Sequence, residues 1–240
     1  MACPGLRPVP TREAMAHEQE KEAAARASLQ FIKDGQVVGL GTGSTAAYFI
    51  KLLAEEVKNG LRIRGIPTSQ RSRELALSLG IPLTTLDECQ EIAVTVDGAD
   101  EVDPQLRLIK GGGGAMLREK IVASATKQLV IVADSSKQVP VLGNFPVPVE
   151  VITFAQALVA KRIRELGAEV RLRILSDGKP FVTDEKNHIL DCRFGPIRDV
   201  EGLARQLSDM PGLVEHGLFV GMASVALFAK GSEIVELRKR

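Results

Sequence analysis

Short apolar runs alternate with helix-forming stretches along the first half of the chain. Residues 13–33 are strong helix formers that end at Asp34-Gly35. The same pattern predicts further helices at 46–57, 74–79 and 115–125 and strands at 37–40, 61–64, 81–86, 92–96 and 128–133. Strands that alternate with helices in this way predict an α/β protein with a mostly parallel sheet and helices on both faces.

The pattern changes after residue 139, where a proline-rich stretch is typical of a linker between compact units. Strands are expected next at 149–152, 170–175, 181–183 and 188–192, with helices at 155–166 and 200–210, which favours a smaller α+β domain. Three more strands are expected at 217–220, 225–228 and 233–237, the last of them back in the first sheet. We therefore expect an α/β domain formed by residues 13–148 and 213–240, and an inserted α+β domain at 149–212.

Composition and charge narrow the class of protein. The 240 residues, 45% hydrophobic and 25% charged, are typical of one large or two modest globular domains. A formal net charge of +1 excludes a general attraction to nucleic acid or to a membrane surface. Prolines in the first ten residues interrupt any apolar signal core, so we expect residues 1–12 to be a disordered lead-in.

Cysteine and histidine positions give no sign of a metal site. The three cysteines are far apart and lack C-x-x-C spacing, which argues against a disulfide framework or zinc and favours the reducing cytosol: they are Cys3, Cys89 and Cys192. The three histidines are equally scattered, and we expect them to be surface or packing residues: they are His17, His188 and His216. No metal is predicted.

A glycine turn at 41–46, Gly-Thr-Gly-Ser-Thr-Ala, lies between an expected strand and an expected helix. Such a turn aims free N–H groups and the positive end of the helix dipole at an anion. The hydroxyl groups of Thr42, Ser44 and Thr45 would add donors. A small phosphate ester is the favoured ligand, and a purely structural turn is the alternative.

The same residues also fit the dinucleotide pattern G-x-G-x-x-A, so a nicotinamide enzyme is a second alternative. That alternative predicts an acid about 20 residues further on, but residues 66–69 read Ile-Pro-Thr-Ser. Arg71 could still receive a 2′-phosphate. A nucleotide-binding P-loop would need a lysine where Gly43 stands.

A second candidate site follows the strand expected at 92–96. Asp97 and Asp100 come directly after this apolar run, where carboxylates are suited to ligand binding and proton transfer, and two nearby carboxylates push each other's pKa apart. An Asp-Gly turn or helix cap is the alternative. Lys110 then precedes four glycines at 111–114, whose entropy cost on folding suggests that something closely approaches their backbone. A flexible loop without a ligand is the alternative.

Two more charged residues complete the candidate chemistry. Glu119 would lie about one turn into the helix after the glycines, where the dipole is expected to keep it ionised and able to accept a proton. An ordinary solvated glutamate is the alternative. Lys137 follows the run at 128–133 and would lie at the same edge of the sheet, unless it is only a surface lysine.

Taken together, these motifs closely resemble ribose-5-phosphate isomerases of the A type. The resemblance runs from about Glu18 to Lys239, is weaker at 221–224, and rests on these segments: 41–45, 68–69, 96–101, 110–115, 118–120 and 134–138. It implies an aldose-ketose isomerase that interconverts ribose 5-phosphate and ribulose 5-phosphate in the pentose phosphate pathway. It also implies a Rossmann-like domain with an inserted ferredoxin-like domain, a homodimer or dimer of dimers, a cytoplasmic location and no cofactor.

The resemblance also implies roles for individual residues. Glu119 would be the general base of an enediolate mechanism, and the reacting end would be surrounded by Asp97, Asp100 and Lys110. The implied substrate contacts are Lys21, Thr42, Gly43, Ser44, Thr45, Asp97, Gly98, Ala99, Asp100, Lys110, Gly111, Gly112, Gly113 and Lys137. Alternatives from other classes are an NAD(P) oxidoreductase and a non-catalytic sugar-phosphate sensor. The sensor would normally carry a DNA-binding extension, and no basic patch or helix-turn-helix pattern is visible in the sequence.

Overall fold

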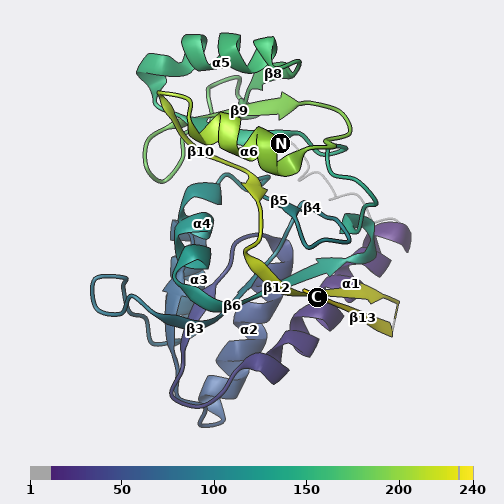
Figure 1. The fold of residues 1–240 in the computed structure, drawn as a ribbon. Helices are drawn as coiled ribbons and strands as arrows, with labels where there is room; N and C mark the ends of the chain where they lie inside the picture. Colours follow the sequence, from purple (N-terminus) through teal and green to yellow (C-terminus); the bar gives the residue numbers. More distant parts are fainter. Residues whose placement is uncertain (1–11, 232, 240) are drawn as a thin grey trace, which may run out of the picture.

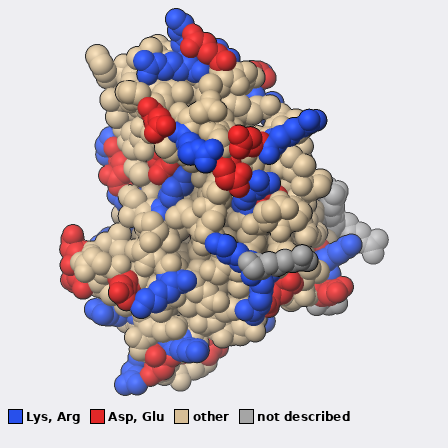
Figure 2. Space-filling view, viewed as in Figure 1, with Lys and Arg blue, Asp and Glu red and all other residues tan. Residues whose placement is uncertain are grey.

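A computed structural model describes residues 12–231 and 233–239 of the chain. The disordered lead-in expected at 1–12 therefore lies outside the described residues, apart from Arg12, where helix α1 begins. Among the described residues, no helix combines the length and the apolar character needed to cross a membrane. On the face in Figure 2, basic and acidic side chains are interspersed, as the near-zero net charge predicts.

The larger of the two main sheets has six strands in the order β13-β12-β6-β3-β1-β2 (Figure 1). In chain order these strands are β1 (Val37–Leu40), β2 (Arg64–Pro67), β3 (Ile92–Asp97), β6 (Thr126–Asp134), β12 (Ala223–Lys230) and β13 (Glu233–Arg238). The first five run parallel, and β13 pairs antiparallel with β12 at the edge. This arrangement confirms the predicted α/β class.

Both faces of the six-stranded sheet are covered by other elements. Side chains along a strand alternate between the two faces, so each strand contributes to the packing on both. Val130 and Val132 of β6 pack on one face against α1 (Arg12–Ser28), α2 (Ser44–Lys58) and α3 (Gln70–Ser78). Leu129 and Ile131 pack on the other face, with α4 (Met116–Ser124) and a small sheet. The strands of that small sheet are β4 (Glu101–Val102), β5 (Leu108–Ile109) and β11 (Leu218–Phe219). Single 3₁₀ turns follow α1 and β6: η1 (Leu29–Phe31) and η2 (Ser135–Lys137).

The other main sheet, at the top of Figure 1, has four antiparallel strands in the order β10-β7-β9-β8. Its elements in chain order are β7 (Val147–Val151), η3 (Thr153–Ala155), α5 (Gln156–Glu165), β8 (Glu169–Leu172), β9 (His188–Arg193), α6 (Val200–Ser208) and β10 (Leu213–His216). The β-α-β-β-α-β succession is that of a ferredoxin-like unit.

Several predicted strands differ from the structure, mainly where a proline lacks the N–H that a strand ladder needs. The run at 81–86, which contains Pro82, makes only an isolated bridge between Gly65 and Leu83. The run at 181–183 follows Pro180 and also makes only isolated bridges. The strand expected at 61–64 begins instead at Arg64, because pairing with β1 sets its start.

The chain returns to the larger sheet at β12, after the boundary predicted at residue 212 but one strand before the strand expected to return at 233–237. Strand β10, beyond the boundary predicted at residue 212, pairs with β7 of the smaller sheet, and β12 is the strand that rejoins β6. The strand expected at 217–220 is shorter in the structure, where it is β11 (Leu218–Phe219). The division of the chain into two separately folded domains stays a prediction.

Three segments rich in polar residues meet at one edge of the larger sheet. Strands β1, β3 and β6 are parallel neighbours, so their carboxyl ends lie side by side, followed by residues 41–45, 97–100 and 134–137. The chain passes from β1 to its neighbour β2 on one side, and the next connection crosses over to β3 on the other side of β1. Ligands bind at such topological switch points in open α/β sheets.

Candidate active site

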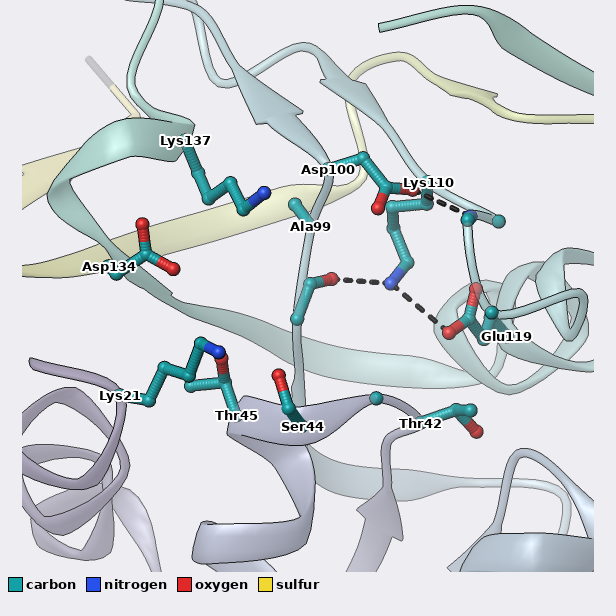
Figure 3. Close-up of a pocket in the computed structure, with 15 residues that line it drawn as sticks. Lys21, Thr42, Ser44, Thr45, Ala99, Asp100, Lys110, Glu119, Asp134 and Lys137 are labelled. Atoms are coloured by element: carbon teal, nitrogen blue, oxygen red, sulfur yellow. Dashed lines mark hydrogen bonds and ion pairs between the residues drawn. The ribbon is translucent and has the colours of Figure 1, made fainter. Parts of the chain in front are cut away.

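A cavity of about 190 Å³ opens at this switch point. Its wall includes all the residues predicted for the site except Asp97, and it gains Asp134, which the motifs did not predict. The lining residues are Lys21, Thr42, Gly43, Ser44, Thr45, Gly98, Ala99, Asp100, Lys110, Gly111, Gly112, Gly113, Glu119, Asp134 and Lys137. Figure 3 shows Lys110 and Glu119 on one side of the cavity and Lys21 and Lys137 on the other.

Lys110 is the centre of the charged side of the cavity, although it is almost fully buried. Its Nζ lies 3.0 Å from Oδ2 of Asp97 and 3.5 Å from Oε1 of Glu119, and it donates a hydrogen bond to the carbonyl oxygen of Gly98. Burial alone would lower the pKa of Lys110, but the neighbouring carboxylates of Asp97 and Glu119 outweigh it and raise the pKa. The lysine is therefore a charged ammonium group inside the site.

Asp97 lies behind Lys110, not on the cavity wall. Its Oδ1 accepts hydrogen bonds from the backbone N–H groups of Thr42 (2.9 Å) and Gly98 (2.8 Å). Gly41 leaves the room for this contact, since an added Cβ would come within 2.3 Å of the same oxygen. The carboxylate therefore links the ends of β1 and β3 and holds the lysine, and the ligand contact expected for Asp97 stays a prediction.

Glu119 occupies the first turn of α4, as predicted, but it is only 5% exposed. Its Oε2 has no hydrogen-bond partner among the residues that the structure describes. Burial, followed by the charge of Asp97, raises the pKa of Glu119 to about 8, even though Lys110 opposes the change. The expectation that the helix dipole keeps this carboxyl ionised at neutral pH is therefore wrong, because desolvation and a second carboxylate outweigh the dipole.

Asp100 connects the first acidic motif to the glycine run. Its Oδ2 accepts a 2.7 Å hydrogen bond from the N–H of Gly112. Burial raises the pKa of Asp100, against the opposing effects of this N–H group and of Lys110. A Cβ at Gly112 would lie 2.5 Å from Oδ1 of Asp100, so a side chain there would displace the carboxylate. The prediction that something closely approaches the glycine backbone is correct, and Asp100 is one such group.

The opposite side of the cavity has the features of an anion site. Ser44 and Thr45 form the start of the 15-residue helix α2, where backbone N–H groups have no partner within the helix. Lys21 reaches the cavity from α1 and pairs with Glu18 at 2.6 Å. Lys137, in η2, makes no ion pair among residues 12–231 and 233–239, so its ammonium group is available to a ligand.

Comparison with known proteins identifies the family. The family model of ribose 5-phosphate isomerase A (phosphoriboisomerase A) matches residues 64–233. The chain belongs to the ribose 5-phosphate isomerase A family. A relative named ribose-5-phosphate isomerase A, from Parvibaculum lavamentivorans, is 51% identical over 92% of this chain and 99% of its own length.

Solved structures of the family have the same fold. A D-ribose-5-phosphate isomerase in complex with phospho-erythronic acid superposes with a TM-score of 0.90 at 39% identity, over 92% of this chain and 99% of that chain. The isomerase from Methanocaldococcus jannaschii gives a TM-score of 0.89 at 40% identity, over the same shares of the two chains. These matches favour the sugar-phosphate interpretation of residues 41–46 over the dinucleotide alternative.

Thr42, on the wall of this cavity, was expected to offer its hydroxyl group to a ligand. Its hydroxyl group lies 2.8 Å from the hydroxyl of Thr68 and donates a 2.8 Å hydrogen bond to Ser69. Those partners follow β2, so the hydroxyl is turned away from the cavity towards the next strand end. Thr42 therefore lines the cavity through other atoms, and the hydroxyl donors expected from this turn reduce to those of Ser44 and Thr45.

Asp134 was missed because a single acid after a strand is a common turn residue. The available signal was that it opens the segment 134–138, which carries part of the family resemblance, at the end of β6. His17, Glu20 and Asp134 come close enough for one metal ion, a cluster that the spacing of the histidines did not predict. Glu20 already accepts the N–H groups of Ser135 and Gly231, so the carboxylates have partners without a cation.

Proposed function

We propose that this isomerase interconverts D-ribose 5-phosphate and D-ribulose 5-phosphate through an enediolate, with Glu119 as the general base. The observation that carries the proposal is a buried carboxyl group with one unpartnered oxygen, on the cavity wall and 3.5 Å from the Lys110 ammonium. A base whose pKa lies near the working pH is well matched to abstraction of a carbon-bound proton. Family membership supports the choice of substrate.

The two sides of the cavity indicate how the substrate lies. The phosphate group would bind at the start of α2, between Lys21 and Lys137, where two cations and free N–H groups face a dianion. The C1–C2 end would then lie between Lys110 and Glu119 (Figure 3). This orientation separates the group that is held from the group that reacts.

The proton steps follow from this placement. Glu119 takes the proton from C2 of the open-chain aldose; the electrons of that bond form the C1–C2 double bond, and the carbonyl pair moves onto O1. A proton then passes from O2 to O1. The protonated Glu119 finally delivers its proton to C1, which leaves a carbonyl group at C2. We assign the transfer between the two oxygens to Asp100, since Asp97 does not reach the cavity wall.

Lys110 supplies electrostatic stabilisation that a single general base cannot provide. Positioned acid–base catalysis contributes about 10²- to 10⁴-fold, whereas enzymes commonly accelerate reactions by at least about 10⁶-fold. Preorganised charges facing the developing oxyanion supply much of the difference. The Lys110 ammonium is held in place by Asp97 and the Gly98 carbonyl, so it does not have to reorganise as charge develops on O1 and O2.

The test is Glu119→Gln, assayed with ribose 5-phosphate deuterated at C2 and by exchange of that position with solvent. The variant should lose about 10³-fold or more in kcat with KM changed less than about threefold, because the amide keeps the shape but cannot accept the proton. Glu185→Gln is the matched control. Glu185 is exposed, lies outside this cavity and pairs with Arg118, which is on α4 like Glu119.

Wild-type turnover in Glu119→Gln would contradict the assignment of the base, and an equal loss in Glu185→Gln would point to a general effect on α4. The family resemblance further predicts a homodimer or dimer of dimers, a cytoplasmic location and a place in the pentose phosphate pathway. We propose these as well. Sedimentation analysis at micromolar concentration tests the assembly, and a monomer would contradict it.

A further inference from the structure

Arg173, which lies beside the smaller sheet, contacts the glycine run at 111–114. Arg173 follows directly after β8, and its side chain is largely buried. Its Nη1 donates to two successive carbonyl oxygens, 2.9 Å from that of Gly111 and 3.1 Å from that of Gly112. A side chain from the four-stranded sheet thus reaches across to the wall of the catalytic cavity.

Arg173 is itself held in place. Its Nε donates to Oδ2 of Asp191 at 3.0 Å, and its Nη2 donates to Oδ1 of the same carboxylate, so the pair is bidentate. The guanidinium also lies 5.9 Å from the ring centre of Phe181. That ring packs against Gly114, where an added Cβ would come within 2.4 Å of it. The smaller sheet therefore contacts the glycine run at both its carbonyls and its far end.

Peptide geometry determines what these contacts do on the cavity side. In a trans peptide the N–H points opposite to the C=O of the same unit. Carbonyls of Gly111 and Gly112 that face Arg173 therefore direct the N–H groups of Gly112 and Gly113 the other way. The first of these N–H groups reaches Asp100 on the cavity wall. The N–H of Gly113 has no partner within the described part of the chain and remains available to a ligand.

We propose that Arg173, oriented by Asp191, is a positioning residue for the isomerisation: it holds the glycine peptides so that the Gly113 N–H faces the enediolate and the Gly112 N–H fixes Asp100. A cation on a carbonyl oxygen also polarises the peptide and strengthens its N–H as a donor. Four adjacent glycines would otherwise sample many conformations. The inference rests on the proposed enediolate mechanism, which Glu119→Gln tests separately.

The test compares Arg173→Met with Arg171→Met. Arg171 lies two residues earlier, on β8, is exposed and, within the described part of the chain, pairs only with Glu169. Its variant therefore makes the same charge change away from the cavity. Arg173→Met should lower kcat about 10- to 100-fold with KM changed less than about threefold, the range expected for a weakened oxyanion donor. Arg171→Met should stay within about twofold of the wild type.

Two inhibitors separate positioning from a loss of structure. Phospho-erythronic acid carries a planar carboxylate that would lie at the reacting end. Its inhibition constant for Arg173→Met should therefore rise by about the same factor as kcat/KM falls. Inorganic phosphate, which needs only the opposite end, should inhibit both variants equally. Arg173→Lys keeps the charge but loses the planar, bidentate set of donors, and Asp191→Asn keeps the shape but loses the charge. The kcat of both variants should fall between those of Arg173→Met and the wild type.

Three results would overturn the proposal: kcat of Arg173→Met within twofold of the wild type, a parallel loss of phosphate inhibition, or the same loss in Arg171→Met. If Arg173→Met does not fold, Arg173→Lys and Asp191→Asn decide, and wild-type values in both would overturn it. A Glu119→Gln variant with normal turnover would instead contradict the mechanism, while the effect of Arg173→Met on phospho-erythronic acid binding would still be measurable.

Discussion

The two sides of the cavity use lysine in opposite ways. Lys110 has a side chain only 3% exposed and lies among the carboxyl groups of Asp97, Glu119 and Asp100. Lys21 is 18% exposed and pairs with a single glutamate at the surface, and Lys137 is only partly buried. The side with Lys110 is thus a group of buried charges in close contact, and the other side is an open anion site with partly exposed lysines.

The difference fits the roles proposed for the two sides. Burying charges costs free energy that close partners must offset, but charges in a dry site act strongly on a developing oxyanion. A phosphate dianion is already charged before it binds, and partly exposed lysines at a helix start attract it without that cost. Exposed charges are, in return, screened by salt, while buried ones are screened much less.

The largest test of this comparison removes one lysine from each side. Lys110→Met should lower kcat about 10³-fold with little change in KM, because it removes the charge nearest the reacting atoms. Lys137→Met should raise KM about 10- to 100-fold and leave kcat within about threefold, the loss expected for one hydrogen bond to a charged group. Steady-state kinetics of both variants in the same buffer measure the contrast.

Salt sharpens the same comparison. Raising ionic strength from about 0.05 to 0.5 M should increase the KM of the wild type and change the Lys137→Met variant less, while kcat of both stays nearly constant. A large fall in kcat with salt, or a loss in Lys110→Met that appears mainly in KM, would show that the two sides do not divide binding and chemistry in this way.

A smaller effect concerns the pH dependence of kcat/KM. The proposed base acts in its deprotonated form, and burial and Asp97 raise the pKa of Glu119 to about 8. The rate should therefore rise about tenfold per pH unit below this value and level off above it. Asp100→Asn should move this rising part of the pH profile to lower pH, since the Asp100 charge also raises the pKa of Glu119. Lys137→Met should leave the profile in place. A pH profile that shifts only in Lys137→Met would contradict the assignment of Glu119 and Asp100 to the same side of the cavity.

The smallest effect is on stability. Between about pH 4.5 and 8 the folded protein binds the Glu119 proton more tightly than the unfolded chain does, so this group makes stability fall as pH rises through that window. Glu119→Gln lacks the titration. It should match the wild type near pH 5 and exceed its free energy of unfolding by about 4 kcal/mol at pH 9, since each pKa unit corresponds to about 1.4 kcal/mol. Denaturant unfolding at both pH values measures this, and a constant difference would contradict it.

The sequence was most informative where chemistry is written in short motifs. Alternating apolar runs predicted the α/β class, and residues 110–115 with 96–101 were sufficient to place the reacting side on the chain. Glu119 was predicted by its place after the glycines, and its position on the cavity wall agrees. Boundaries were weaker: β2 and β10 are placed by pairing partners far away in the sequence, which local hydropathy does not contain.

Burial and distant contacts were decided by the tertiary structure alone. Asp97 and Asp100 look alike in sequence, yet one lies behind Lys110 and the other on the cavity wall, because one follows the pleat of β3 into the sheet edge and the other turns out towards Gly112. Arg173 is 62 residues from Gly111 along the chain and lies directly after β8, a strand of the other main sheet.

The sequence by itself thus determined the fold class, the family motifs and the residue types at the site. Only the folded chain decided which charged groups are buried, which are paired and which have shifted pKa values. The reason is that desolvation and Coulomb energy depend on distances between segments that are far apart in the sequence.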